Sequence, residues 1–410
     1  MSNSRKIAWF VWIIASIFYA YQYILRVMPS IMLTDLMHQF KIDTTVFGQF
    51  SGIYYIGYSL MHLPIGIMLD RFGPRKVMTS CILLTVIGLL PIVYAHDWVY
   101  PIIGRLLIGI GSSAAILGTF KIIRMTFSEH HFTRMLSLSV TIGLLGAIYG
   151  GGPVSYMCTL WGYHTVVQIF ILIGLLLAFL TYCIVPEMES VHESSIAADM
   201  KTVFTNPKVL LLCLFAGMMV GPLEGFADVW GSVFLKQVYG MDASVATYLP
   251  SMIFMGMCFG SPVLSFIAEK SGFYLGSIIG AGLVMLTTFI LLVSGALAVE
   301  SITFGFILVG VCCAYQILAI YKASTYVPEH VAGLTTAVAN MIIMSFGYVL
   351  HSLIGYLVQL YGGPQTANAL IHGISVIPFT LLIGVSGFIV IALRERFKLS
   401  SKLTNNQNVY

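Results

Sequence analysis

Charged residues are scarce in this sequence. Only 9% of its 410 residues are Asp, Glu, Lys or Arg, whereas 58% are apolar and the mean hydropathy is +0.93. A soluble domain needs many more charged side chains to cover its surface. The composition therefore excludes an ordinary soluble protein. It indicates about twelve apolar helices of ~20–25 residues that cross a membrane.

Signals for several other classes of protein are also missing. The net charge is only +4 and no basic patch is interleaved with aromatic residues, so we expect no nucleic-acid partner. The seven cysteines lie mostly inside apolar runs and form no C-x-x-C pair, which indicates apolar fillers rather than disulfides or metal ligands. The ATP-binding pattern G-x-x-x-x-G-K-[ST] and the hydrolase patterns H-E-x-x-H and G-x-S-x-G are absent. We expect no cofactor, no metal site and no enzymatic activity.

The apolar runs predict an all-α polytopic membrane protein. We place its twelve transmembrane helices at residues 7–34, 44–69, 75–95, 99–124, 132–156, 164–185, 208–236, 243–268, 273–297, 300–324, 331–358 and 366–393. The first run is too long for a signal peptide, so we expect it to stay uncleaved. A polar stretch divides the helices six and six. We expect an N-terminal six-helix bundle at 1–185, a cytoplasmic linker at 186–207, a C-terminal six-helix bundle at 208–393 and a mobile cytoplasmic tail at 394–410.

Lysine and arginine are distributed unequally between the two sides of the membrane. If the N-terminus is inside, sixteen of the twenty Lys and Arg residues lie in cytoplasmic segments, and only Lys41 and Lys236 lie outside. The remaining two, Arg26 and Arg105, lie within helices. This is a strong positive-inside bias. We therefore predict that both termini are cytoplasmic.

A short internal repeat links the two halves. The sequence D-R-F-G at 70–73 follows the second predicted helix, and E-K-S-G at 269–272 follows the eighth, 199 residues later. The match is brief, but it falls after the second helix of each half. Duplicated halves with a substrate site at their interface are a common plan of transporters.

The loop after the second helix carries a longer motif. Residues 66–76 read G-I-M-L-D-R-F-G-P-R-K and resemble the signature loop G-x-x-x-D-R-x-G-x-R-K of the major facilitator superfamily. Residues 105–111 resemble the R-x-x-x-G-x-G pattern of that family, and 143–153 resemble its glycine-proline motif. Residues 21–30, Y-Q-Y-I-L-R-V-M-P-S, are similar to a branch that includes phagosomal amino-acid transporters of intracellular bacteria and lysosomal dipeptide carriers.

The resemblance implies a twelve-helix major facilitator fold that works by alternating access as a monomer. It also implies a small-molecule substrate and a multi-pass location in the bacterial cytoplasmic (inner) membrane. Arg26 is similar in position to the phosphate-binding arginine of organophosphate exchangers.

Residues of the signature loop are predicted to act in gating. Asp70 ends the second helix, and residues 73–74, Gly-Pro, suit a tight turn. Arg71 and Arg75 are cationic on the cytoplasmic side. Asp70 can pair with an arginine or with a neighbouring helix end, and such a pair can hold one conformation and break in another. Arg105, from the second motif, is assigned to gating or coupling by resemblance. The alternative is that these are ordinary charges of the cytoplasmic side.

Four predicted helices carry polar side chains on one face. These stripes are Tyr19, Gln22, Tyr23 and Arg26; Tyr55, Tyr58 and His62; Glu224 and Asp228; and Asn340, Gly347 and His351. Ionisable groups within a membrane cost roughly 2.5–3.5 kcal/mol each, so they usually serve a function. The stripes therefore predict a polar site between the helices.

The offset between the halves brings opposite charges together. The first and seventh helices begin 201 residues apart, so Arg26 corresponds to position 227, between Glu224 and Asp228. We predict a clamp for a zwitterion, in which Arg26 binds a carboxylate through two parallel hydrogen bonds and a carboxylate binds an ammonium group. Aromatic residues would supply apolar walls with polar tips. The predicted substrate-binding residues are Arg26, Tyr23, Gln22, Tyr55, Tyr58, Glu224, Asp228, Trp230, Tyr315, Lys322 and Lys121.

Glu224, Asp228 and His62 are the candidates for proton coupling. A carboxylate in a half-apolar cavity takes up a proton more readily than one in water, and histidine titrates near neutral pH. A lone buried histidine is more often a packing residue. The sequence therefore favours a secondary transporter, a proton-coupled importer of amino acids or small peptides.

Other interpretations stay open. Arg26 could extend to the membrane surface, or could form only a salt bridge with Glu224 that joins the halves and acts as a gate. Lys121 and Lys322 correspond at an offset of 201 residues near the inner ends of the fourth and tenth helices. Substrate binding by these lysines would suit an organic-anion or organophosphate exchanger. Drug or metabolite efflux is a further alternative.

Overall fold

The computed structural model describes residues 3–127, 129–187, 196–328 and 331–407. Every regular element in these ranges is a helix. The N-terminal half contains α1 (Asn3–Val27), α2 (Pro29–Phe40), α3 (Thr44–Tyr94), α4 (Val99–Ser112), α5 (Ala114–Thr126) and α6 (Glu129–Ile184). The predicted linker contains α7 (Ile196–Phe204). The C-terminal half contains α8 (Pro207–Met218), the π-helix η1 (Gly221–Trp230), α9 (Gly231–Val238), α10 (Ala243–Tyr248), α11 (Ser251–Ser271), α12 (Tyr274–Val293), α13 (Val299–Cys313), α14 (Tyr315–Ser324), α15 (Ala332–Leu360), α16 (Ala367–Ile374) and α17 (Val376–Gln407).

These helices form twelve spans. Ten stretches of the described chain are helical, long and apolar enough to cross a membrane. Two of them, Thr44–Tyr94 and Arg134–Ile184, have 51 residues each, about twice the length that a bilayer requires. Each contains a glycine with positive φ, Gly73 at 75° and Gly162 at 74°, where the helical conformation is interrupted. Ten stretches, two of them divided, give twelve spans and confirm the predicted all-α polytopic architecture.

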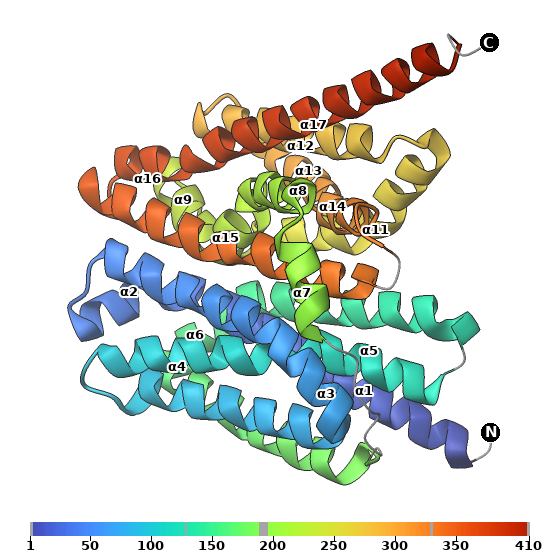
Figure 1. Ribbon diagram of the computed structural model, residues 1–410. Coiled ribbons are helices and arrows are strands. Elements are labelled where there is room, and N and C mark those ends of the chain that lie inside the picture. The colour runs from blue at the N-terminus through green and yellow to red at the C-terminus, as the bar shows by residue number, and fades with distance from the viewer. Residues whose placement is uncertain (1–2, 128, 188–195, 329–330, 408–410) are drawn as a thin grey trace.

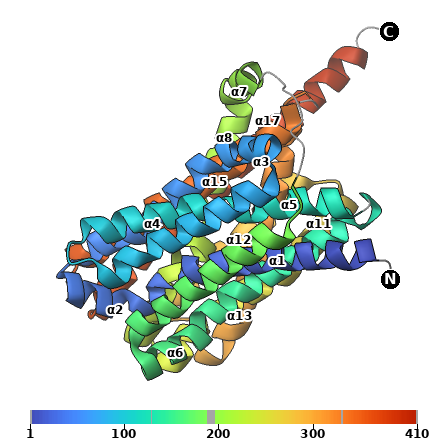
Figure 2. The same ribbon diagram turned by 90° about the horizontal axis from the view of Figure 1, so that it is seen from below.

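The two halves of the chain lie side by side with their helices roughly parallel (Figure 1, Figure 2). α1–α6 form one group and α8–α17 form the other, and α7 packs mainly against α8 and α15. The contacts between the groups are made mainly by α15 with α3 and by α11 with α6. The first and last described residues lie at the same end of the molecule. An even number of spans requires this arrangement.

Glycines bring α3 and α15 into backbone contact. A Cβ atom added at Gly52 would lie 2.9 Å from the Cα of Tyr348, and one at Gly48 would overlap the carbonyl oxygen of His351. Small residues allow such close approach between helices in a membrane. The two halves are therefore packed tightly along this seam.

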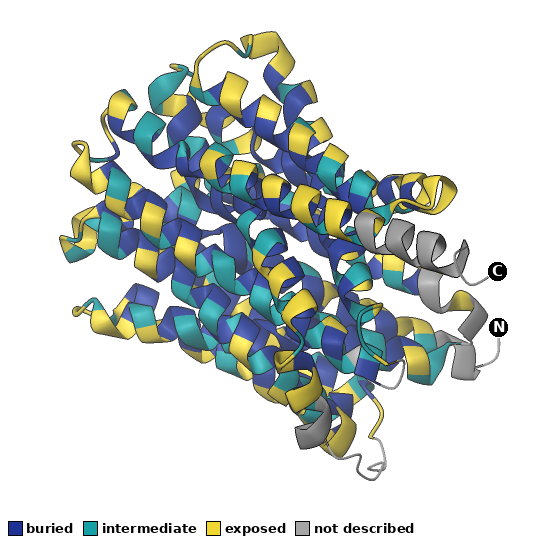
Figure 3. Ribbon diagram, turned by 45° about the horizontal axis from the view of Figure 1, so that its top comes forward, coloured by how far each residue is buried: buried dark blue, intermediate teal, exposed yellow. Residues whose placement is uncertain are grey.

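The outer surface is apolar. Phe179, Phe304 and Phe379 expose 64%, 71% and 65% of their surface. Exposed residues alternate with buried ones along the peripheral helices, and the buried residues face the interior (Figure 3). An exterior of this kind suits hydrocarbon rather than water. It agrees with the length and composition of the spans.

The first predicted helix, 7–34, is divided in the structure. α1 ends at Val27 and α2 begins at Pro29. Proline has no backbone N–H, and its ring clashes with the carbonyl four residues earlier, which here belongs to Leu25. The expectation of one continuous helix is therefore wrong. The carbonyl of Leu25 becomes available to another donor.

The seventh predicted helix, 208–236, is also interrupted. α8 ends at Met218, and the chain continues as η1 and then α9. The N–H of Gly231 donates to the carbonyl of Phe226, five residues earlier, as a π-helix requires. All ten residues of η1 are buried. The irregular backbone is thus covered by protein, which is the setting in which membranes tolerate it.

Two further differences concern the linker and the tail. Residues 196–204 of the predicted linker are helical, as α7. α17 continues to Gln407, so residues 394–407 are helical where the sequence suggested a mobile tail.

The internal repeat is visible in a pair of helix breaks. α4 and α5 meet at Ser113, and α13 and α14 meet at Ala314, 201 residues later. This is the offset that relates Lys121 to Lys322. Corresponding breaks in the fourth and tenth spans support a duplicated plan.

Candidate functional site

Arg26 lies at the end of α1 and faces two carboxylates of η1. Its Nε donates to Oδ2 of Asp228 at 2.7 Å, and its Nη2 donates to Oε2 of Glu224. The side chain of Arg26 is 8% exposed and those of both carboxylates are 1% exposed. The predicted placement of a cation from one half against anions from the other is confirmed.

Tyr55 of α3 completes this arrangement. Its hydroxyl donates to Oε2 of Glu224 at 2.6 Å and also contacts Oδ2 of Asp228. The guanidinium carbon of Arg26 lies 5.1 Å from the ring centroid of Tyr23 and 5.2 Å from that of Tyr55, a cation–π geometry. We call Arg26, Tyr55, Glu224 and Asp228 the central ion cluster. It joins α1 and α3 of one half to η1 of the other.

Arg105 of α4 supports the end of α1 that carries Arg26. Its two terminal nitrogens donate to the carbonyl oxygens of Leu25 at 2.6 Å and Arg26 at 2.8 Å. The first of these is the carbonyl that Pro29 leaves without a helical partner. Arg105 thus takes the place of the missing backbone donor and fixes the direction of α1 beside the cluster.

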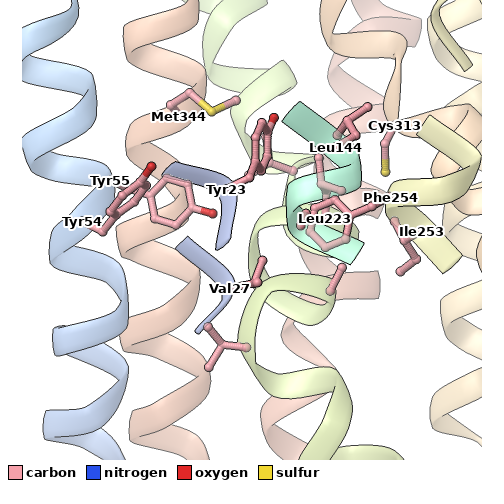
Figure 4. Packing of buried hydrophobic residues seen from close by; sticks show 14 of the residues in the cluster. Tyr23, Val27, Tyr54, Tyr55, Leu144, Leu223, Ile253, Phe254, Cys313 and Met344 are labelled. Carbon is pink, nitrogen blue, oxygen red and sulfur yellow. The ribbon is translucent and has the colours of Figure 1, made fainter. Parts of the chain in front are cut away.

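Tyr54 is a neighbour that the sequence did not single out. Its hydroxyl donates to Oε1 of Gln22 at 2.7 Å, and its ring centroid lies 4.7 Å from the guanidinium carbon of Arg105. Tyr54 and Tyr55 both point from α3 toward α1 in Figure 4. Gln22 therefore binds Tyr54 and not the carboxylates. The sequence signal for Tyr54 was its position next to Tyr55, which belongs to a predicted polar stripe.

His62 and Tyr58 lie farther along α3. The ring centroid of His62 is 5.2 Å from that of Tyr58, and its Nε2 is 3.4 Å from Nδ2 of Asn340 in the other half. His62 follows Tyr55 by seven residues, about two turns of helix. A proton role for His62 would therefore operate at a distance from the carboxylates. The fully buried His351 lies closer, with its ring centroid 5.7 Å from that of Tyr55.

The other predicted substrate-binding residues make contacts elsewhere. Trp230 packs edge-on against Phe47, with centroids 6.1 Å apart. The hydroxyl of Tyr315 donates to the carbonyl of Ala216 at 2.7 Å. Neither contributes a hydrogen bond to the central ion cluster within the described chain.

Lys121 and Lys322 each form an ion pair within their own half. Nζ of Lys121 lies 2.7 Å from Oδ1 of Asp70, and Nζ of Lys322 lies 3.1 Å from Oε2 of Glu395. Neither pair crosses between the halves. Asp70 thus pairs with a lysine of α5, a contact that the sequence did not predict.

Glu187 binds the cationic loop between the second and third spans. Its carboxylate oxygens lie 2.6 Å from Nζ of Lys76 and 3.8 Å from Nη1 of Arg75. The hydrogen bond from Lys76 holds the pKa of the Glu187 carboxyl below its usual range. Arg75 also lies over the ring of Tyr182, 4.3 Å from its centroid. Arg71 is adjacent in sequence to Asp70. This loop is therefore tied to the start of the linker.

The comparisons with known proteins fit this architecture. The family model described as Major Facilitator Superfamily matches residues 11–352. The chain belongs to the major facilitator superfamily. It is consequently a multi-pass membrane transporter of a small molecule, works by secondary transport and is not an enzyme.

Relatives of this chain are named for the handling of different small molecules. A chloramphenicol resistance protein of Acinetobacter baumannii is 23% identical over 78% of this chain and 79% of its own length. A nitrite extrusion protein of Bacillus subtilis is 22% identical over 78% of this chain and 80% of its own length. At this identity the names do not specify a substrate for this chain.

Solved structures show the same fold. A bacterial homologue of the human lysosomal transporter Spinster, in an inward-facing and unoccupied conformation, matches with a TM-score of 0.73 and 16% identity over 95% of this chain and 97% of its own. The nucleoside transporter NupG matches with a TM-score of 0.76 and 15% identity over 95% and 99%. These similarities concern the fold alone.

Proposed function

We propose that this transporter is a proton-coupled importer of amino acids or small peptides. The observation that carries the proposal is the central ion cluster, in which one guanidinium from the N-terminal half meets two carboxylates from the C-terminal half. A zwitterion carries one negative and one positive group, the two charges that these partners bind. It can therefore replace the contacts that the protein makes with itself.

The charge balance of the cluster favours uptake of a positive charge. Two carboxylates face the single guanidinium of Arg26, and Oδ1 of Asp228 has no hydrogen-bond partner among the described residues. Arg105 makes no hydrogen bond to either carboxylate, because its terminal nitrogens donate to the carbonyls of α1. A buried anion without a full set of partners is unfavourable. A proton on Glu224 or Asp228, or the ammonium group of a substrate, would remove the excess.

Substrate binding would couple to movement of the halves in the following way. The carboxylate of the substrate takes the guanidinium of Arg26, and its ammonium group takes Glu224 or Asp228. The direct bond between the halves is then replaced by one through the substrate, which changes the relative stability of their arrangements. We infer that residues 1–185 and 208–393 rock about this site, with both termini in the cytoplasm of a bacterium.

Efflux is the second candidate. It is suggested by the names of two relatives, one for chloramphenicol resistance and one for nitrite extrusion. The same cluster could exchange a cationic or polar drug against protons. An organic-anion exchanger is less favoured, because Lys121 and Lys322 are already paired with carboxylates.

Transport by purified protein in liposomes tests the proposal. Labelled amino acids, dipeptides, nucleosides, sugar phosphates and chloramphenicol would be offered with and without an inward proton gradient. We expect uptake of a zwitterion that the gradient stimulates, and loss of that uptake in Arg26→Ala and Glu224→Gln. Exposed charges far from the cluster, changed in Lys236→Gln and Glu300→Gln, serve as matched controls that should transport normally.

Two results would overturn the proposal. One is uptake of sugar phosphate or chloramphenicol alone. The other is zwitterion uptake that survives both substitutions in the cluster.

A further inference from the structure

A second charged pocket lies in the C-terminal half, apart from the central ion cluster. It has a volume of about 280 Å³ and lies between the start of α8, the middle of α17 and the segment after α14. Its lining includes Lys208, Leu211, Tyr326, Ile391, Arg394 and Glu395. Neither the transport cycle nor the signature motifs use these residues.

Positive charge dominates this pocket. Nζ of Lys208 and Nζ of Lys322 lie 5.6 Å and 5.1 Å from the ring centroid of Tyr326, so two ammonium groups share one ring. Glu395 pairs with Lys322 at 3.1 Å. Lys208 and Arg394 form no ion pair within the described residues. Lys322 and Glu395 balance each other, so the charges of Lys208 and Arg394 are left in excess and attract an anion.

The pocket is held open by contacts between its walls. The hydroxyl of Tyr326 donates to Oε1 of Glu395 at 2.5 Å, and Nδ2 of Asn206 donates to the carbonyl of Tyr326 at 3.0 Å. These bonds tie α17 and the start of α8 to the same residue. An anion would thus find its cations already in place, which reduces the entropy lost on binding.

The position of the pocket along the spans points to a lipid. Lys208 and Arg394 lie within three residues of the ends of the spans Pro207–Val238 and Ala367–Arg396. One turn further into each span, Leu211 and Val390 are 42% and 48% exposed. Basic residues at the end of a span with exposed apolar residues beside them match the layers of a phospholipid.

We propose that this pocket binds the phosphate head group of an anionic phospholipid through Lys208 and Arg394. The acyl chains lie along the exposed apolar residues of α8 and α17. Glu395, which is paired with Lys322, opposes the ligand and limits its affinity. Such a lipid would join the start of the seventh span to the end of the twelfth.

Native mass spectrometry and thermal unfolding in detergent test the site. The purified protein would be titrated with phosphatidylglycerol, with phosphatidylcholine and with inorganic phosphate. We expect retained lipid adducts and a higher melting temperature with phosphatidylglycerol only. The double variant Lys208→Gln/Arg394→Gln should bind it roughly thirtyfold more weakly, on the usual attraction of a basic residue to an anionic surface.

A matched control is available at the same end of the half. Lys270 lies over the ring of Phe266 at 5.8 Å and Arg396 over that of Phe273 at 4.8 Å, outside the pocket. The double variant Lys270→Gln/Arg396→Gln also removes two positive charges, and it should keep the preference for phosphatidylglycerol. Equal losses in both double variants would show nonspecific attraction and overturn the proposal.

The variant Glu395→Gln is expected to change lipid affinity in the opposite direction. It removes the opposing carboxylate and frees Lys322, so it should strengthen binding of phosphatidylglycerol. Weaker binding in this variant, or stabilisation of the wild type by inorganic phosphate alone, would contradict a lipid site.

Discussion

The corresponding spans of the two halves are interrupted in different ways. α1 stops before Pro29, and Arg105 from α4 satisfies the carbonyls at its end. The equivalent span of the other half widens into η1, whose end is closed by the backbone bond from Gly231 to Phe226. The first break presents a guanidinium, and the second presents two carboxylates. A duplicated helix has thus become the positive pole in one half and the negative pole in the other.

Removing the positive pole should have the largest effect. Arg26→Ala leaves two carboxylates buried without their cation, so we expect a loss of about 3–5 kcal/mol in the free energy of unfolding and no transport. Unfolding in detergent and liposome uptake measure the two effects. The triple variant Arg26→Met/Glu224→Gln/Asp228→Asn should recover most of the stability and none of the transport. A triple variant that stays as unstable as Arg26→Ala would refute the charge-based explanation.

Removing the hydroxyl that bridges the two carboxylates should have the next largest effect. Tyr55→Phe removes the donor to Glu224 and Asp228 but keeps the ring beside Arg26. A hydrogen bond to a charged group contributes about 1.5–3 kcal/mol, which sets the expected loss of stability. Tyr58→Phe is a control on the same helix. Similar losses in both variants would mean that the tyrosine hydroxyl has no special place in the cluster.

A substitution of Arg105 tests whether its hydrogen bonds stabilise the end of α1 that carries Arg26. Arg105→Lys keeps the charge but offers a point donor in place of two separate nitrogens, so one carbonyl of α1 loses its partner. We expect a loss of about 1–3 kcal/mol for the unsatisfied carbonyl. Pro29→Ala in the same background should restore part of this stability, because the backbone of residue 29 can then donate to Leu25. If the double variant recovers no stability, Arg105 does not replace the backbone donor that is missing at Pro29.

The sequence predicts the poles better than it predicts the breaks between them. Hydropathy and the offset of 201 residues place Arg26 opposite Glu224 and Asp228, because repeated halves bring equivalent depths together. The π-helix cannot be predicted from this spacing. Glu224 and Asp228 are four residues apart and would share one face of an ordinary α-helix as well. The pairing of Lys121 and Lys322 with carboxylates also depends on contacts between helices that are distant in sequence.

The smallest effects are expected at glycines in η1 and at the start of α9. A Cβ atom at Gly225 would meet its nearest neighbour, Cδ1 of Ile354, at 3.5 Å, so Gly225→Ala fits and should stabilise the fold by about 0.4–1 kcal/mol. A Cβ atom at Gly231 would lie 2.8 Å from the carbonyl oxygen of Phe226, so Gly231→Ala should destabilise it. Melting temperatures of the two variants measure the contrast. The same sign in both would argue against the packing around η1.

A double-mutant cycle between Arg26 and Glu224 tests the central claim most directly. The free energy of unfolding in detergent would be measured for the wild type, Arg26→Gln, Glu224→Gln and the double variant. If the guanidinium and the carboxylate bind each other across the halves, the two substitutions should be strongly non-additive, with a coupling of about 1–3 kcal/mol. Effects that add to within about 0.5 kcal/mol would contradict a direct bond between the two poles.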